Sequence, residues 1–192
     1  MRIDQAIPHV KSQLTKKRFD HTIRVVEQAI ELAELYDVDT EKASLAAVFH
    51  DYAKNRPLEE MRRLIIESTL PKDLLNHHHE LWHGPVGSIL VKREHGVIDM
   101  DIHSAIQYHT TGKAHMSKLE LVIYVADYIE PGRDFPGVEE VRMIAQKDLI
   151  QAAWLVSRNT IQFLLEKRAQ VYPDTYHAYN DLTRRLFERQ EN

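Results

Sequence analysis

A histidine followed directly by an aspartate, His50-Asp51, ends an apolar run that favours a helix. An imidazole nitrogen and a carboxylate oxygen both bind metal ions. Because an α-helix has about 3.6 residues per turn, adjacent side chains lie about 100° apart around its axis and can reach one cation or a pair of cations. The dipeptide alone is a weak signal. Four further residues of ligand type strengthen it: His21, His83, His109 and Asp127.

The elements that must position these residues are amphipathic helices. His21, His50 and Asp127 fall on three predicted helices, at about 16–36, 41–52 and 119–129, and each points to an apolar side. Buried carboxylates are costly unless they are paired or bind a cation. A core histidine or a helix-packing salt bridge explains any one of these residues taken alone. Their occurrence together on inward faces favours a metal site.

The composition predicts an all-α fold. Six Gly and seven Pro are few for 192 residues, and good helix formers are plentiful. Thr15, Asp39 or Thr40, and a capping box from Ser117 to Glu120 mark helix starts, while Gly96 marks an end. Further helices are expected at about 4–14, 58–67, 86–94, 102–109, 139–145 and 148–167, and from Pro173 onward.

Charge and cysteine content exclude several classes of protein. A net charge of −4 gives no general attraction to nucleic acid or to an anionic membrane, so neither is an expected partner. The absence of cysteine excludes disulfide scaffolds and thiolate zinc sites. The N-terminus lacks the apolar core of a signal peptide, and no run approaches a membrane span of about 20 residues. We therefore expect a cytoplasmic protein, and its amphipathic terminal helices permit a homodimer.

The order of a lone His21, the pair His50-Asp51 and a distant Asp127 resembles the HD-domain metal-dependent phosphohydrolases. His83-Gly84 and His109-Thr110-Thr111-Gly112 supply a second pair of histidines, and HD proteins with these histidines hold two metals. The resemblance implies a single HD-domain helical bundle over residues 1–192. Its metal core would lie at about 15–135, with C-terminal helices at 148–190 packed on it. His21, His50, Asp51, His83, His109 and Asp127 would bind metal, with Asp51 as the bridge.

Longer strings narrow the resemblance to the YqeK family, and they cover nearly the whole chain. The strings are Arg18-Phe19-Asp20-His21-Thr22, His50-Asp51-Tyr52-Ala53-Lys54, His83-Gly84, His109-Thr110-Thr111-Gly112, Met116-Ser117, Ala126-Asp127-Tyr128-Ile129-Glu130-Pro131-Gly132-Arg133 and Tyr176-His177-Ala178-Tyr179-Asn180. This resemblance implies a symmetrical bis(5′-nucleosyl)-tetraphosphatase that hydrolyses diadenosine tetraphosphate to two ADP. It also implies a dinuclear metal centre that uses iron, although nitrogen and oxygen ligands would accept Mn, Co or Zn as well.

The predicted chemistry needs cations as well as metals. Two metals can activate water and orient an in-line displacement, so no Ser or Cys nucleophile is required. We predict that Asp51, Lys54 and Arg133 take part in catalysis. The predicted substrate-binding residues are Arg18, His83, Thr110, Arg133 and Tyr172. Two alternatives stay open: an HD-domain nucleotidase or phosphodiesterase acting on another nucleotide, and a metal- and nucleotide-binding sensor.

Overall fold

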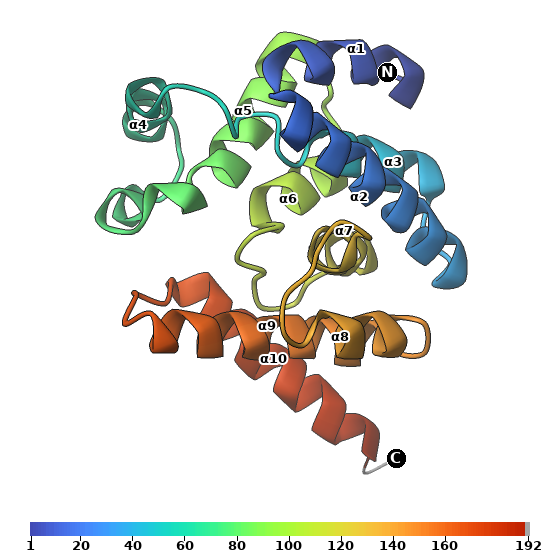
Figure 1. Ribbon diagram of the computed structural model, residues 1–192. Helices are drawn as coiled ribbons and strands as arrows, with labels where there is room; N and C mark the ends of the chain where they lie inside the picture. The colour runs from blue at the N-terminus through green and yellow to red at the C-terminus, as the bar shows by residue number, and fades with distance from the viewer. Residues whose placement is uncertain (191–192) are drawn as a thin grey trace.

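The computed structural model describes residues 1–190, and it consists of helices joined by short turns (Figure 1). No β-strand occurs within these residues, which confirms the predicted all-α class. The α-helices are α1 (Ile3–Gln13), α2 (Lys16–Leu35), α3 (Thr40–Phe49), α4 (Leu58–Glu67), α5 (His83–His95), α6 (Met100–Tyr108), α7 (Lys118–Ile129), α8 (Val138–Ala145), α9 (Leu149–Glu166) and α10 (Pro173–Gln190). Two short 3₁₀ helices, η1 (Lys72–Asn76) and η2 (His79–Leu81), lie between α4 and α5.

Helix α7 lies in the middle of the molecule. It packs against α2, α3 and α6 on one side and against α8 and α9 on the other (Figure 1). Helix α10 packs on α9, and α4 contacts α5 and η1 at the opposite edge. No helix in the described part of the chain is long and apolar enough to cross a membrane.

The helix starts follow from local side-chain chemistry. Asp39 accepts hydrogen bonds from the backbone amides of Glu41 and Lys42, which satisfies donors that the first turn of α3 leaves free. Ser117 and Glu120 form the predicted capping box of α7. Gly96 ends α5 in the left-handed conformation, with φ of 64°, which a glycine adopts at little cost.

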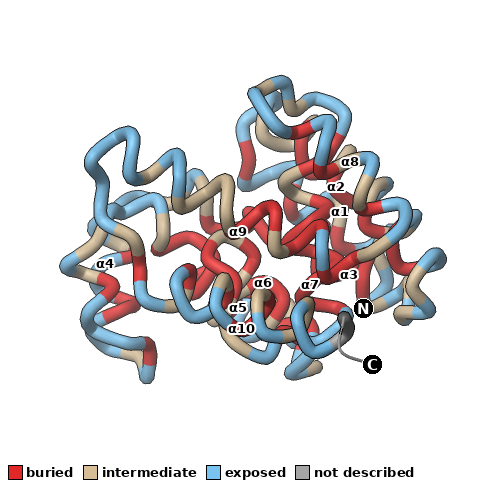
Figure 2. The backbone as a smooth tube through the Cα atoms, turned by 90° about the horizontal axis from the view of Figure 1, so that it is seen from below, coloured by how far each residue is buried: buried red, intermediate tan, exposed pale blue. Residues whose placement is uncertain are grey.

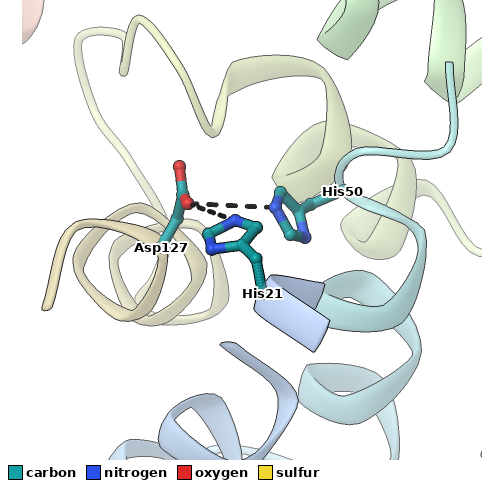
Figure 3. A group of neighbouring side chains, drawn as sticks. All are labelled: His21, His50 and Asp127. Carbon is teal, nitrogen blue, oxygen red and sulfur yellow. Dashed lines mark ion pairs between the residues drawn. The ribbon is translucent and has the colours of Figure 1, made fainter. Parts of the chain in front are cut away.

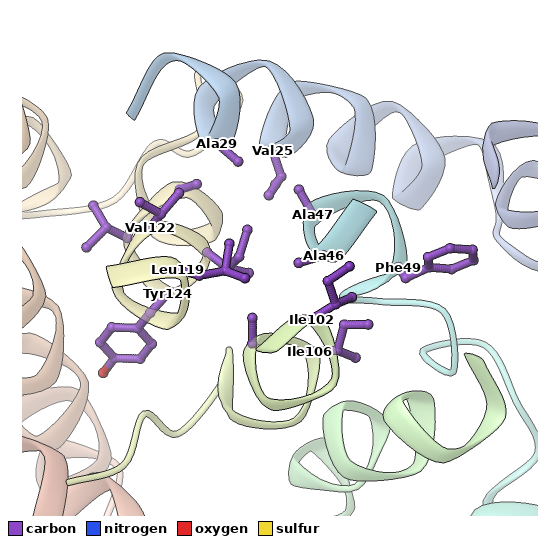
Figure 4. Packing of buried hydrophobic residues seen from close by; sticks show 14 of the residues in the cluster. Val25, Ala29, Ala46, Ala47, Phe49, Ile102, Ile106, Leu119, Val122 and Tyr124 are labelled. Carbon is purple, nitrogen blue, oxygen red and sulfur yellow. The ribbon is translucent and has the colours of Figure 1, made fainter. Parts of the chain in front are cut away.

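Small and branched side chains fill the space between α2, α3, α6 and α7. Ala46 and Ala47 of α3 are fully buried and allow close approach of neighbouring helices (Figure 4). Val25 of α2, Ile106 of α6 and Val122 of α7 complete this part of the core. Buried backbone runs through the centre of the molecule, whereas the outer turns of α4 and many connecting loops are exposed (Figure 2).

Two helices end earlier than predicted, and both ends bear on the site. Helix α3 stops at Phe49, not near Tyr52, because hydrogen bonds of the i to i+3 type replace the helical pattern from His50 onward. Helix α6 stops at Tyr108. The first residue past each end, His50 and His109, keeps a right-handed helical backbone conformation. The two histidines therefore project from helix ends.

Candidate metal centre

Five segments bring the six predicted ligand-type residues together. His21 comes from the second turn of α2 and Asp127 from the last turns of α7. His50 and Asp51 follow α3, His83 is the first residue of α5, and His109 follows α6. All four histidines and Asp51 are buried, and the Asp127 side chain is 20% exposed. The structure thus assembles the whole predicted set.

Two groups of donor atoms share this region, and each could hold a metal ion. The first group is His21, His50 and Asp127 (Figure 3). The Nε2 atom of His21 lies 3.1 Å from Oδ1 of Asp127, and Nε2 of His50 lies 3.9 Å from the same oxygen. The second group is His50, Asp51 and His109.

The carboxylate of Asp51 faces both pairs of histidines. Its Oδ2 atom lies 3.7 Å from Nε2 of His21 and 3.4 Å from Nε2 of His50. Its Oδ1 atom lies 3.1 Å from Nε2 of His83 and 3.9 Å from Nε2 of His109. Oδ2 therefore faces His21 and His50, and Oδ1 faces His83 and His109. A carboxylate shared between two cations requires this arrangement.

The backbone fixes the ring orientation of three histidines in the same way. The Nδ1 atom of His50 lies 2.6 Å from the carbonyl oxygen of Ala47, three residues earlier. His83 and His109 repeat this contact with the carbonyls of Glu80 at 2.6 Å and Ile106 at 2.8 Å. Because a carbonyl only accepts hydrogen bonds, each Nδ1 carries a proton. In its neutral form, each ring therefore offers its Nε2 lone pair to the centre.

His21 is held by a side chain instead. Its Nδ1 atom lies 3.0 Å from Oε1 of Glu130, a carboxylate that is 2% exposed. Arg24 donates to Oε2 of Glu130 at 2.5 Å, and the amide of Gly132 donates to the same oxygen at 2.6 Å. Although burial alone would raise it, hydrogen bonds from Arg24 and His21 hold the pKa of Glu130 at about 2. At metal sites, a carboxylate commonly accepts a hydrogen bond from the far ring nitrogen of a histidine and so orients the ring toward the metal.

The donor atoms fit a cation. The Nε2 atoms of His21 and His50 are buried and have no hydrogen-bond partner among the described residues. The Nε2 atoms of His83 and His109 face each other at 3.0 Å. Burial and the nearby His50 and His83 lower the pKa of His109 to about 3, so this ring is neutral. When both rings are neutral, their two Nε2 lone pairs oppose each other, and a positive charge between them removes the conflict.

Cations already balance the two carboxylates. Burial alone would raise the pKa of Asp51, but His50 and His83 hold it well below its usual value. Arg18 donates to Oδ2 of Asp51 at 2.9 Å, and Arg133 donates to Oδ1 of Asp127 at 2.6 Å. Both carboxylates are therefore ionised, and two guanidinium groups border the metal-binding atoms.

A cleft of about 580 Å³ opens next to these guanidinium groups. Its size is within the range of small-molecule sites. It is rich in cations, although the chain as a whole is acidic. The residues that line it are Thr15, Lys17, Arg18, His21, Arg24, Lys54, Asn55, Glu80, Glu130, Gly132, Arg133, Asp134 and Phe135.

Other predicted site residues take different places. Thr110 is close to the centre, with its hydroxyl 3.0 Å from Nε2 of His109. Lys54 donates to Glu80 at 2.6 Å and lines the cleft. Tyr172 is not among the residues that line the cleft. It is buried, and its hydroxyl donates to Asp73 at 3.4 Å. The structure does not bring Tyr172 together with the other predicted site residues.

Sequence reasoning missed three residues that the structure brings to the site. Arg24 and Glu130 form the support of His21, and Phe135 lines the cleft. Glu130 carried a readable signal, because it directly follows the apolar helix of Asp127 and lies three residues after it. Arg24 lies three residues after His21, on the same side of α2. Nothing local distinguishes Phe135, whose place depends on the loop after α7.

Comparison with known proteins agrees with this geometry. The HD domain family matches residues 18–132. A symmetrical bis(5′-nucleosyl)-tetraphosphatase of Bacillus subtilis is 54% identical over 94% of this chain and 97% of its own length. A protein with the same name from Staphylococcus aureus is 42% identical, with the same coverage. The crystal structure of an HD superfamily hydrolase from Clostridium acetobutylicum matches with a TM-score of 0.90 and 39% identity. It covers 95% of this chain and 97% of that one.

These matches and the histidine–aspartate cluster define the class: the chain belongs to the HD-domain family of metal-dependent phosphohydrolases. Within that family it belongs to the YqeK group, whose curated relatives carry the name symmetrical bis(5′-nucleosyl)-tetraphosphatase. The resemblance found in the sequence strings is thereby confirmed.

Proposed function

We propose that the chain hydrolyses diadenosine tetraphosphate symmetrically and releases two ADP. One observation carries this proposal: six buried or partly buried ligand residues, two with unpartnered Nε2 atoms, adjoin a cation-rich cleft. The names of relatives that are 42–54% identical over nearly the whole chain support the same substrate.

We further propose a dinuclear centre held by His21, His50, Asp51, His83, His109 and Asp127. Asp51 supports the count of two, because each of its oxygens faces a different pair of histidines. Two bound metals would lower the pKa of water and polarise phosphoryl oxygens. Nitrogen and oxygen donors accept several metals, and the resemblance to the YqeK family favours iron.

The chain's own residues bind and orient the polyphosphate. Arg18 and Arg133 lie between the cleft and the metal-binding carboxylates, where the phosphates of a substrate would approach. A planar guanidinium binds two phosphate oxygens at once, which fixes the scissile phosphorus relative to the centre. The Nζ atom of Lys54 lies 3.5 Å from Nδ1 of His83 and adds a positive point charge beside that histidine. These groups neutralise charge that builds up as ADP departs.

Product analysis tests the activity. The metal-loaded enzyme should convert diadenosine tetraphosphate into two ADP, and in ¹⁸O-labelled water one of them should carry the label on its terminal phosphate. AMP with ATP as products would contradict symmetrical cleavage, and tight nucleotide binding without turnover would indicate a sensor. Elemental analysis of anaerobically purified protein tests the metal, and two equivalents of iron are expected.

A further inference from the structure

A second hollow adjoins the cleft at the other end of the ligand set. It measures about 300 Å³ and includes His83, whereas the larger cleft includes His21. Lys54, Asn55 and Glu80 line both, so the two hollows meet there. Asp51 lies between them, because its two oxygens face His21 and His83 separately. A ligand centred on Asp51 can therefore extend in both directions.

The two hollows differ in their linings. The larger cleft offers Lys17, Arg18, Arg24 and Arg133, which suits phosphates. The second hollow adds two apolar residues, Leu58 and Met61, and three polar ones, Arg56, His79 and His83, to the residues that it shares with the cleft. Its own guanidinium is already engaged, because Arg56 is paired with Glu60 and with Glu94.

The second hollow is therefore suited to an uncharged, partly apolar group. Of its two apolar residues, Leu58 is 46% exposed and Met61 is buried. The imidazole of His79 is 45% exposed, so a flat ring can reach it. Leu58 and Met61 give the second hollow an apolar wall beside its polar residues, and sites that bind a nucleoside base combine apolar contacts with placed polar groups.

We infer that the second hollow binds the second nucleoside of the substrate. The inference rests on the proposed function, and its reason is symmetry. The bond cleaved lies at the midpoint of diadenosine tetraphosphate, so equal arms must extend from the metal ligands on both sides. One nucleotide arm occupies the larger cleft. The other passes Lys54 and places its base against Leu58, Met61 and His79. The second hollow therefore makes the enzyme prefer a substrate with a nucleoside at both ends over one with a nucleoside at a single end.

Substitution of Leu58 tests this assignment. Leu58→Asp places a carboxylate in the first turn of α4, where the helix dipole tolerates it. Ile66→Asp is the matched control, because Ile66 lies on the same helix, is 47% exposed and lines neither hollow. The substrates are diadenosine tetraphosphate and adenosine 5′-tetraphosphate, which lacks the second nucleoside.

We expect Leu58→Asp to lower kcat/KM for diadenosine tetraphosphate by about 10-fold or more, the usual effect of spoiling an apolar pocket. For adenosine 5′-tetraphosphate the change should stay below about twofold, and Ile66→Asp should alter neither value. Equal losses on both substrates, or no loss on either, would overturn the inference. Wild-type protein that leaves diadenosine tetraphosphate intact would instead refute the proposed function.

Equilibrium binding of ADP gives a readout that needs no turnover. The metal-loaded wild-type protein should bind two ADP, one in each hollow. Leu58→Asp should bind one, and the Ile66→Asp control should keep two. A single ADP bound to the wild type, or two bound to Leu58→Asp, would contradict a second nucleoside site even if hydrolysis itself proved symmetrical.

Discussion

The two carboxylate oxygens of Asp51 connect the two pairs of histidines. The carboxylate of Asp51 lies within 4 Å of four histidine nitrogens, two on each of its oxygens. No other side chain in the described cluster contacts both pairs in this way. Loss of its charge would remove the group that, in the proposed dinuclear centre, lets two cations lie close together.

Asp51→Asn keeps the size of the side chain and removes this charge. We expect metal content to fall from two equivalents to below one and hydrolysis to be abolished, while the helical circular dichroism spectrum is unchanged. Asp101→Asn serves as control, because Asp101 is an exposed partner of Lys42 outside the cleft. Two equivalents of metal in Asp51→Asn would contradict the bridging assignment.

Glu130 is a positioning residue for His21. Glu130→Gln can still contact Nδ1 of His21, but it loses the charge that favours this orientation and that pairs with Arg24. Metal affinity should fall by about 10- to 100-fold, the usual cost of losing such a partner. Metal titration measures this, and Glu27→Gln on the exposed side of α2 is the control. Rescue by Glu130→Asp would support a role for the charge itself.

The same carboxylate makes stability depend on pH. The pKa of Glu130 is about 2 in the folded protein and about 4.5 without its partners. Because the folded value is the lower one, the stabilisation is complete above about pH 4.5 and is lost as the pH falls toward 2. In metal-free protein, the free energy of unfolding should therefore fall more steeply across this interval in the wild type than in Glu130→Gln. Denaturant titrations at several pH values measure the difference.

At the scale of elements, close packing of α5 on α6 places His83 beside His109. A Cβ atom at Gly84 would lie 2.8 Å from the carbonyl oxygen of Gln107 and 3.1 Å from that of Ile106. Backbone atoms cannot move aside as a flexible side chain can. Glycine at this position therefore sets the approach of the two helices and, with it, the 3.0 Å between the two Nε2 atoms.

Gly84→Ala should separate these two helices at the site. We expect one equivalent of metal to be lost while the other remains, together with about 1–3 kcal/mol of stability from overpacking. Gly87→Ala on the same helix is a matched control, because its nearest contact would be an ordinary 3.7 Å from Ala53. Elemental analysis and thermal unfolding of both variants check this. Two equivalents of metal in Gly84→Ala would contradict this prediction, because α5 would then have moved without separating His83 from His109.

Local patterns explain why so much of the site was readable in the sequence. The caps at Thr15, Asp39 and Ser117 depend on residues two or three positions away, and all three are confirmed. Four of the six predicted ligands, His21, His50, Asp51 and Asp127, are readable as polar residues on apolar helix faces. His83 and His109 are readable through the resemblance to the family. The contact between His21 and Glu130 is not readable from local patterns, because the two residues lie 109 positions apart, although the place of Glu130 just after the apolar helix of Asp127 is a signal in itself.

A helix end that the sequence misplaces has the same physical cause, which is contact between residues distant in the sequence. The end of α3 was placed too late because His50 to Ala53 would also suit a helix, and tertiary contacts favoured turns instead. The role of Tyr172 in substrate binding stays a prediction, and its ring packs against His77 at 4.9 Å. That position depends on how α10 docks, which no local pattern reveals.

At the scale of the whole molecule, the site depends on packing from both ends of the chain. The apolar core runs from Ala6 in α1 to Leu182 in α10, and α7 carries Asp127 through its middle. We propose that the helices after the HD match at residues 18–132 form one domain with it. Helices α8 and α9 cover the face of α7 opposite α2, and α10 packs on α9.

Metal should therefore stabilise the entire fold. Ligands from five segments meet at the centre, so an unfolded chain cannot supply them together. Metal at about 100 times its Kd should add about 2.7 kcal/mol to the free energy of unfolding. Thermal scans with and without a chelator measure this effect, and Asp51→Asn should show little of it. An unchanged Tm in the wild type would contradict metal binding by the folded state.

The repeated contact from Nδ1 to the carbonyl three residues earlier has a consequence for how the centre can diverge. For His50, His83 and His109 the proton is placed by the main chain, which no substitution removes. For His21 it is placed by Glu130, which a single codon change can alter. The position of the ring proton is thus fixed by the main chain in three imidazoles and by a replaceable side chain in one. Changes in metal preference among homologous chains should therefore trace to the residue that occupies position 130.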